Sequence, residues 1–251
     1  MTEPGMTEPG PPPAEFSLFQ LLPNVLTILA ICAGLTAIRL GVQGDYVRSV
    51  LLILGAAIID GIDGRLARLL RSSSKMGAEL DSLADFLNFG VAAPLTLYFW
   101  ALQDLRGLGW ISVLVFAVCC VIRLARFNVS AKSEEPRDSA YFQGVPSPAG
   151  ALLVMLPMYL SFAIADRAVL PDLAICLHMV LVGLLMISRL PTWSFKTTRI
   201  SRENVKFVLV GVAVFGAALF SFAWLTLIAL CLGYVAMVIW AWIDGRRPRS
   251  R

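Results

Sequence analysis

Long apolar stretches recur along almost the whole chain, and they constrain its fold more than any other feature. Eight of them are about 20 residues long, which is the length that an α-helix needs to cross a membrane. Hydrophobic residues make up 58% of the 251 residues and charged residues 15%, whereas soluble domains contain about 25% charged residues. The chain is therefore predicted to be all-α, a polytopic membrane helix bundle, and an ordinary soluble globule is excluded. We place the transmembrane helices at residues 23–43, 46–71, 79–102, 108–128, 148–166, 171–190, 205–222 and 224–243.

The two ends of the chain differ from this apolar domain. Residues 1–13 repeat the pentapeptide MTEPG and end in three prolines, a composition typical of a disordered tail. Residues 14–22 have near-helical spacing of apolar side chains and predict a short interfacial helix before Pro23. The membrane domain then covers residues 14–245, with a basic tail at 246–251. Since only residues 221–224 separate the last two helices, a seven-helix bundle is the alternative.

The basic residues predict the orientation in the membrane. Of the 21 lysines and arginines, 17 lie in or beside the connections 2–3, 4–5 and 6–7 or in the C-terminal tail. Basic residues accumulate on the cytoplasmic side of membrane proteins, so we expect these connections and both termini there. The protein is thus predicted to lie in the cell (inner or plasma) membrane. Its net charge of +4 favours contact with anionic membrane lipids, and no nucleic acid partner is expected.

Four carboxylates interrupt the apolar pattern of two successive helices. Asp60 and Asp63 are three residues apart, and Asp81 and Asp85 are four apart, so each pair lies on one helical face. The connection between the helices is short, and the four side chains can therefore meet near the cytoplasmic boundary. Such a cluster repels itself unless cations neutralise it, and oxygen ligands suit Mg²⁺ or Mn²⁺. We expect two divalent ions about 3.5–4 Å apart.

Small residues lie beside these aspartates at helical spacing. Gly61, Gly64 and Ala67 would leave helix backbone open to a nucleotide or pyrophosphate, although plain helix packing explains them as well. Arg65 and Arg68 follow on the same helix and can hold phosphate oxygens in a forked geometry. For Arg65 the alternative is contact with anionic lipid head groups.

The full pattern is Asp60-x2-Asp63-Gly64-x2-Ala67-Arg68-x8-Gly77-x3-Asp81-x3-Asp85. It resembles the signature of the CDP-alcohol phosphotransferases at all eight fixed positions. The resemblance implies that the first three aspartates bind a divalent metal pair, and that Asp85 is both a ligand and the general base. It also implies a CDP-diacylglycerol site lined by Gly64, Ala67, Arg68 and Gly77, as well as a homodimer.

Further segments are similar to the phosphatidylserine synthase branch of that family. They are PNVLT from Pro23, GAELDSLADFLNFGVAAP from Gly77, RLARFN at 123–128, FQGVPSPAGA at 142–151 and LLMISRLP at 184–191. The implied reaction joins the phosphatidyl group of CDP-diacylglycerol to the hydroxyl of L-serine and releases CMP. Asn24 and Thr27, three residues apart, could hydrogen-bond the cytidine, and the alternative is an ordinary polar helix end.

The zwitterionic serine needs a cation for its carboxylate. Arg123 and Arg126 are the first candidates, with Asn128 as a hydrogen-bonding partner, and Arg189 and Lys196 come next; positive-inside topology is the alternative explanation for each. Phe142–Pro148 is expected to form a rigid turn that shapes the acceptor pocket. The single histidine, His178, lies in an apolar helix and is poorly placed to activate a serine or cysteine nucleophile. We therefore predict direct displacement without a covalent enzyme intermediate.

Two other functions compete with this one. A member of the same family could use glycerol 3-phosphate or an inositol phosphate as the acceptor alcohol. A small membrane transporter would also carry intramembrane carboxylates. Transporters tend to hold such charges near the middle of the membrane, whereas here they gather at one corner between two helices.

Overall fold

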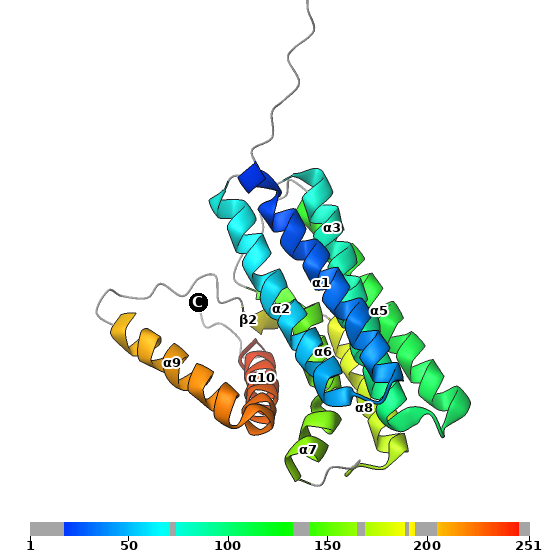
Figure 1. Ribbon diagram of the computed structural model, residues 1–251. Coiled ribbons are helices and arrows are strands. Elements are labelled where there is room, and N and C mark those ends of the chain that lie inside the picture. Colours follow the sequence, from blue (N-terminus) through cyan, green and yellow to red (C-terminus); the bar gives the residue numbers. More distant parts are fainter. Residues whose placement is uncertain are drawn as a thin grey trace, which may run out of the picture.

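Helices occupy every predicted apolar stretch and build one elongated bundle with a further helix pair at its side (Figure 1). The computed structural model describes residues 18–70, 74–132, 141–164, 169–188, 191–193 and 205–245. Its helices are α1 (Leu18–Val42), α2 (Tyr46–Leu69), α3 (Lys75–Asp85), η1 (Phe86–Ala92), α4 (Ala93–Leu97), η2 (Tyr98–Leu102), α5 (Arg106–Lys132), α6 (Ser147–Val154), α7 (Leu156–Ile164), α8 (Asp172–Ile187), α9 (Val205–Ser221) and α10 (Ala223–Gly245).

The predicted class, a helical membrane protein, is confirmed. Within the described residues, four helices are long and apolar enough to cross a membrane: Leu21–Val42, Gly107–Ser130, Ser147–Ile164 and Ala223–Ile243. Helix α2 has 24 residues, but Asp60 and Asp63 interrupt its apolar run. The number of eight membrane spans stays a prediction.

The first helix differs from its prediction at the N-terminal end. We expected an interfacial helix over 14–22 that ends before Pro23, but α1 begins at Leu18 and passes through Pro23 without a break. A proline removes one backbone hydrogen bond, and so close to the start of a helix that loss affects little more than the first turn. Residues 14–17 lie outside the described part of the chain.

The predicted helix at 79–102 begins four residues earlier and contains two wider turns. The π-helical segments η1 and η2 alternate with α-helical turns between Lys75 and Leu102. Asn88 of η1 is buried, and a Cβ atom on Gly34 of α1 would overlap its side-chain oxygen. Glycine at this position therefore lets α1 and η1 approach closely.

The predicted helix at 148–166 is divided into α6 and α7 at Met155. Pro157 lies two residues later and offers no backbone N–H to the preceding turn, which explains the interruption. The buried core gathers around this point, and its largest members include Tyr159, Phe89 and Phe116.

A short β-ribbon joins the segment before α6 to the segment after α8. Strands β1 (Tyr141–Gln143) and β2 (Pro191–Trp193) pair antiparallel, with Phe142 opposite Thr192. Gly144 follows β1 with a φ of 82°, a left-handed conformation that glycine adopts readily, and the chain then enters α6 at Ser147. The turn expected at 142–148 is thus partly a strand.

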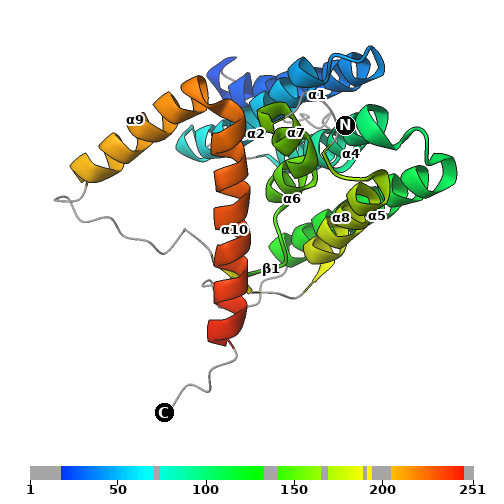
Figure 2. The same ribbon diagram turned by 90° about the horizontal axis from the view of Figure 1, so that it is seen from below.

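The last two helices stand apart from the rest of the bundle. Helix α10 packs against α7, β2 and α9, whereas α9 packs mainly on α10 and reaches away from the other helices (Figure 2). Side chains such as Leu209, Val214 and Phe220 are exposed on α9. An exposed apolar surface of this kind is expected for a helix in contact with lipid.

Candidate active site

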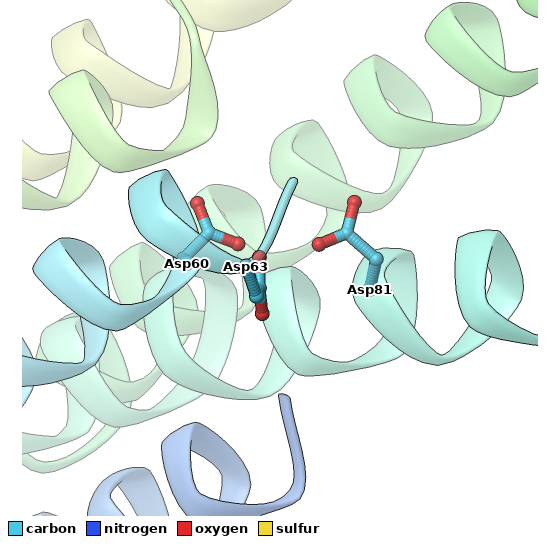
Figure 3. Close-up of side chains that lie close together, drawn as sticks. All are labelled: Asp60, Asp63 and Asp81. Carbon is cyan, nitrogen blue, oxygen red and sulfur yellow. The ribbon is translucent and has the colours of Figure 1, made fainter. Parts of the chain in front are cut away.

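Three of the four predicted carboxylates meet at one point between α2 and α3. Asp60 and Asp63 of α2 and Asp81 of α3 each offer a carboxylate oxygen, and these oxygens lie within 4.8 Å of one another. Figure 3 shows the three side chains directed toward a common space between the two helices. We call these residues the acidic cluster. The helical spacing read from the sequence thus predicted the juxtaposition correctly.

The start of α3 is fixed by local contacts that bring Asp81 to this place. Ser74 caps the helix, and its Oγ accepts a hydrogen bond from the Gly77 backbone N–H at 2.9 Å. A Cβ atom on Gly77 would lie 2.9 Å from Oδ1 of Asn24. Gly77 therefore also allows α1 to lie close against α3, with Asn24 at the contact.

Thr27 of α1 holds one aspartate of the acidic cluster. Its hydroxyl lies 2.9 Å from Oδ2 of Asp63 and 3.0 Å from the carbonyl oxygen of Pro23, so it can donate to either acceptor. Asp63 is 2% exposed, and its Oδ1 has no hydrogen-bond partner within the described residues. The bond fixes the carboxylate and leaves one oxygen for a ligand. The cytidine contact expected of Thr27 stays a prediction.

Asp85 lies beside the acidic cluster, one helical turn beyond Asp81. It interacts with Asp60 and Asp81 of the acidic cluster and also, electrostatically, with Arg123 of α5. Its Oδ1 is buried and has no hydrogen-bond partner in the described part of the chain. Among the described residues, Arg123 is the arginine that interacts with Asp85, and Asp85 thus connects it to the acidic cluster.

The acidic cluster fits a divalent metal ion. Its ligand atoms are all carboxylate oxygens, which Mg²⁺ and Mn²⁺ prefer. A buried carboxylate oxygen without a partner, such as Oδ1 of Asp63, is costly unless a cation or a hydrogen-bond donor satisfies it. Asp60, Asp63 and Asp81 are therefore the residues that would hold such an ion.

The face of α2 next to the acidic cluster is open. No atom would lie within 4 Å of a Cβ atom on Gly61 or Gly64, so neither glycine is needed there for packing within the described chain. Arg68 is exposed, and its Nε donates to the Gly64 carbonyl oxygen at 3.0 Å. This bond holds the guanidinium group beside the open face. Arg65 is exposed, and Ala67 is half-buried nearby.

The predicted acceptor residues are separated by the structure. Arg123 is half-buried, donates to Ser147 Oγ at 3.2 Å and lies 5.6 Å from the centre of the Phe127 ring. Arg126 is exposed and donates to the carbonyl oxygen of Ile187, the last residue of α8, at 3.0 Å. Arg126 thus stabilises a helix end, whereas Arg123 bonds α6 and interacts with Asp85.

Of the remaining acceptor candidates, the structure describes only Asn128. Asn128 is hydrogen-bonded to Ser82, with Nδ2 and Oγ 3.0 Å apart, and this ties α5 to the residue next to Asp81. Arg189 and Lys196 lie outside the described residues. Ser147 was not singled out from the sequence, although it lies in the FQGVPSPAGA segment, and its full burial could not be read there.

A family model matches most of the helical domain. The model for CDP-alcohol phosphatidyltransferase covers residues 20–187, which include every residue of the acidic cluster together with Asp85 and Arg123. The chain belongs to this family. The resemblance read from the aspartate pattern is thereby confirmed, and the chain is an integral membrane enzyme.

Curated relatives of this phosphatidyltransferase share a name among themselves. A CDP-diacylglycerol–serine O-phosphatidyltransferase of Mycobacterium leprae is 37% identical over 226 residues, which cover 88% of this chain and 74% of the relative. The enzyme of the same name from Helicobacter pylori is 36% identical over 191 residues, 76% of this chain and 78% of the relative. That of Mycobacterium tuberculosis strain H37Rv is 49% identical over 137 residues, 53% of this chain and 47% of the relative.

Solved structures of another family member are also similar to this phosphatidyltransferase. A phosphatidylinositol phosphate synthase of M. tuberculosis with CDP-DAG bound matches with a TM-score of 0.49 and 20% identity, over 73% of this chain and 98% of that chain. The same enzyme in complex with manganese and citrate matches with a TM-score of 0.48 and 21% identity, over 72% and 90% of the two chains. Enzymes of the CDP-alcohol phosphatidyltransferase family depend on divalent metal ions, in agreement with the acidic cluster.

Proposed function

We propose that the chain is a phosphatidylserine synthase, which transfers the phosphatidyl group of CDP-diacylglycerol to the hydroxyl of L-serine and releases CMP. One observation carries the proposal: Asp85 interacts with Asp60 and Asp81 of the acidic cluster and also with the half-buried Arg123. A metal-bound phosphate donor fits the first side, and a small acceptor with one carboxylate fits the second. The names of the relatives at 36–49% identity support serine as that acceptor.

The donor site is proposed along the open face of α2. Gly61 and Gly64 leave room for the nucleotide beside the acidic cluster, and Arg68 is held next to them by its bond to Gly64. Arg68 and Arg65 would bind phosphate oxygens, because a guanidinium group pairs well with them. Asn24, at the contact between α1 and Gly77, would hydrogen-bond the cytidine.

The proposed reaction is a single displacement at phosphorus. Asp85 accepts the proton of the serine hydroxyl as the new bond forms between that oxygen and the phosphorus atom that carries the lipid. The bond between this phosphorus and the departing CMP oxygen breaks in the same step. Divalent ions held by Asp60, Asp63 and Asp81, expected to be Mg²⁺ or Mn²⁺, would offset the negative charge on the pyrophosphate.

Charge favours serine over a phosphorylated acceptor. A phosphate group carries up to two negative charges and is commonly bound by several cations. Within the described residues, Arg123 is the one arginine that interacts with Asp85, and its second partner, Ser147, is neutral. One cation beside the base suits the carboxylate of an amino acid.

The acceptor screen tests this function directly. The purified protein would receive CDP-diacylglycerol and Mn²⁺ or Mg²⁺, together with L-serine, glycerol 3-phosphate or an inositol phosphate, and CMP release would be measured. We expect release with L-serine alone. Release that depends on either phosphorylated alcohol would replace the proposed function with that of another family member.

A second measurement tests the direct displacement. Without serine, labelled CMP should not exchange into CDP-diacylglycerol, because no covalent phosphatidyl-enzyme is formed. Exchange without an acceptor, or a phosphatidyl adduct detected by mass spectrometry, would contradict the single-step reaction.

Orientation and assembly belong to the same proposal. The distribution of the basic residues supports an active site on the cytoplasmic side with both termini in the cytoplasm. The family resemblance supports a homodimer, which would be tested by the mass of the purified protein in detergent.

A further inference from the structure

Tyr234 of α10 carries a buried hydroxyl group with no hydrogen-bond partner within the described residues. Its side chain helps to line an apolar pocket of about 400 Å³, to which α6, α8 and α10 contribute Leu153, Leu181 and Val238. A buried hydroxyl without a partner lowers stability unless another group satisfies it, and a hydroxyl that lies at a pocket can be satisfied by a ligand. The hydroxyl is therefore a candidate for binding a ligand.

The surroundings of Tyr234 indicate which ligand it would meet. Tyr234 and Arg123 are close enough to interact electrostatically, and Arg123 in turn interacts with Asp85. Val145, which lines the same pocket, lies two residues before Ser147, the hydrogen-bond partner of Arg123. Tyr234 is thus a neighbour of Arg123, which belongs to α5 and bonds α6, whereas the acidic cluster belongs to α2 and α3.

We propose that Tyr234 is an acceptor-binding residue, and that its hydroxyl donates a hydrogen bond to the carboxylate group that Arg123 attracts. The inference rests on the proposed function, because it assumes an acceptor with a carboxylate. A neutral donor next to one arginine adds a second hydrogen bond to a carboxylate without adding charge. It would favour an amino acid over a more highly charged phosphorylated alcohol.

The position of Tyr234 in the chain gives the proposal a further consequence. The family model ends at residue 187, and Tyr234 lies 47 residues beyond it. Helix α10 is held against the bundle by its packing on β2 and α7. The acceptor pocket is therefore completed by a helix that the family pattern does not include.

The test is the Tyr234→Phe variant, which removes the hydroxyl and keeps the ring. Steady-state kinetics of CMP release would be measured with L-serine and CDP-diacylglycerol varied in turn. We expect the KM for serine to rise about tenfold, as for a lost hydrogen bond to a charged group, while the KM for CDP-diacylglycerol and kcat change less than about twofold.

Tyr159→Phe is the matched control. Tyr159 also has a buried hydroxyl without a partner in the described residues, and it stacks on Trp224 of α10 with ring centres 6.3 Å apart. It has no interaction with Arg123 among its electrostatic neighbours. We expect its kinetic constants to equal those of the wild type.

Each outcome decides something. An unchanged serine KM in Tyr234→Phe overturns the inference and leaves the proposed function in place. Equal rises in both KM values, or the same rise in Tyr159→Phe, show a structural role and overturn it too. If the wild-type protein releases no CMP with serine, the proposed function fails, and the inference fails with it.

Discussion

The two sides of Asp85 are built in different ways. The proposed donor side consists of the acidic cluster and the open glycine face of α2, and most of it comes from one stretch of 26 residues. The proposed acceptor side brings together Arg123 of α5, Ser147 of α6 and Tyr234 of α10. The first side offers carboxylate oxygens to a cation, and the second offers a cation and hydroxyl groups to an anion.

The geometry of the two sides has different origins. On the donor side the helical repeat sets the geometry, since residues three and four apart share a face. On the acceptor side the geometry depends on how distant helices pack, so a change in packing alters it without touching the aspartates. Variants of the acidic cluster should abolish turnover and variants of the glycine face should weaken donor binding, whereas variants on the acceptor side should raise the KM for serine.

The largest effect is expected from the acidic cluster. Asp60→Asn or Asp81→Asn keeps the size of the side chain and removes a charge that would hold the metal, so CMP release should fall about 10³-fold or more. Asp172→Asn at the start of α8 is the control, and it should retain full activity. Activity within tenfold of the wild type in both cluster variants would show that the acidic cluster does not hold a metal ion needed for turnover.

The next largest effect separates Arg123 from Arg126. Arg123→Ala should raise the KM for serine about 100-fold, because it removes the positive charge that interacts with Asp85 among the described residues, and leave the KM for CDP-diacylglycerol nearly unchanged. Arg126→Ala removes only a bond to the end of α8 and should change the serine KM less than about threefold. If Arg126→Ala has the larger effect, the carboxylate binds elsewhere than we propose.

A smaller effect should come from Thr27, which supports the acidic cluster without joining it. Thr27→Val removes the hydrogen bond to Asp63, and the concentration of Mn²⁺ needed for half-maximal activity should rise about tenfold. Thr36→Val is a matched control on the same helix, because Thr36 bonds only the Cys32 carbonyl oxygen and is exposed. An unchanged metal requirement in Thr27→Val would limit the hydroxyl to a role in folding.

The smallest effect tests the open face of α2. Gly64→Ala adds a methyl group where the structure leaves space, so the melting temperature should stay the same while the KM for CDP-diacylglycerol rises about fivefold. Gly34→Ala is the contrasting variant, since its methyl group would overlap Asn88 and should lower the melting temperature instead. A rise in the serine KM alone for Gly64→Ala would contradict the division of the two sides.

The donor side could be predicted from the sequence because its distances are local. The spacing of Asp60, Asp63 and Asp81 fixes their faces on two neighbouring helices, and the structure adds little to their placement. The bond between Thr27 and Asp63 could not be predicted, because the residues are 36 positions apart and belong to different helices.

The acceptor side shows more clearly what the sequence could not predict. Arg123 and Arg126 occur in one short segment and were both candidates for the serine carboxylate, yet one turns to Ser147 and the other to Ile187. Which partner each arginine meets depends on where α6 and α8 pack against α5. For the same reason nothing in the sequence indicated Tyr234, which comes close to Arg123 only when α10 packs against the bundle.

The exposed glycine face of α2 also affects how the donor arrives. Within the described residues no side chain covers Gly61 or Gly64, so a lipid-borne nucleotide could slide in sideways along the leaflet without waiting for a helix to open. Loading would then follow the surface density of that lipid in the bilayer. Adding inert phospholipid to the vesicles lowers the surface density of CDP-diacylglycerol and should slow the enzyme, even when the total amount of CDP-diacylglycerol is unchanged.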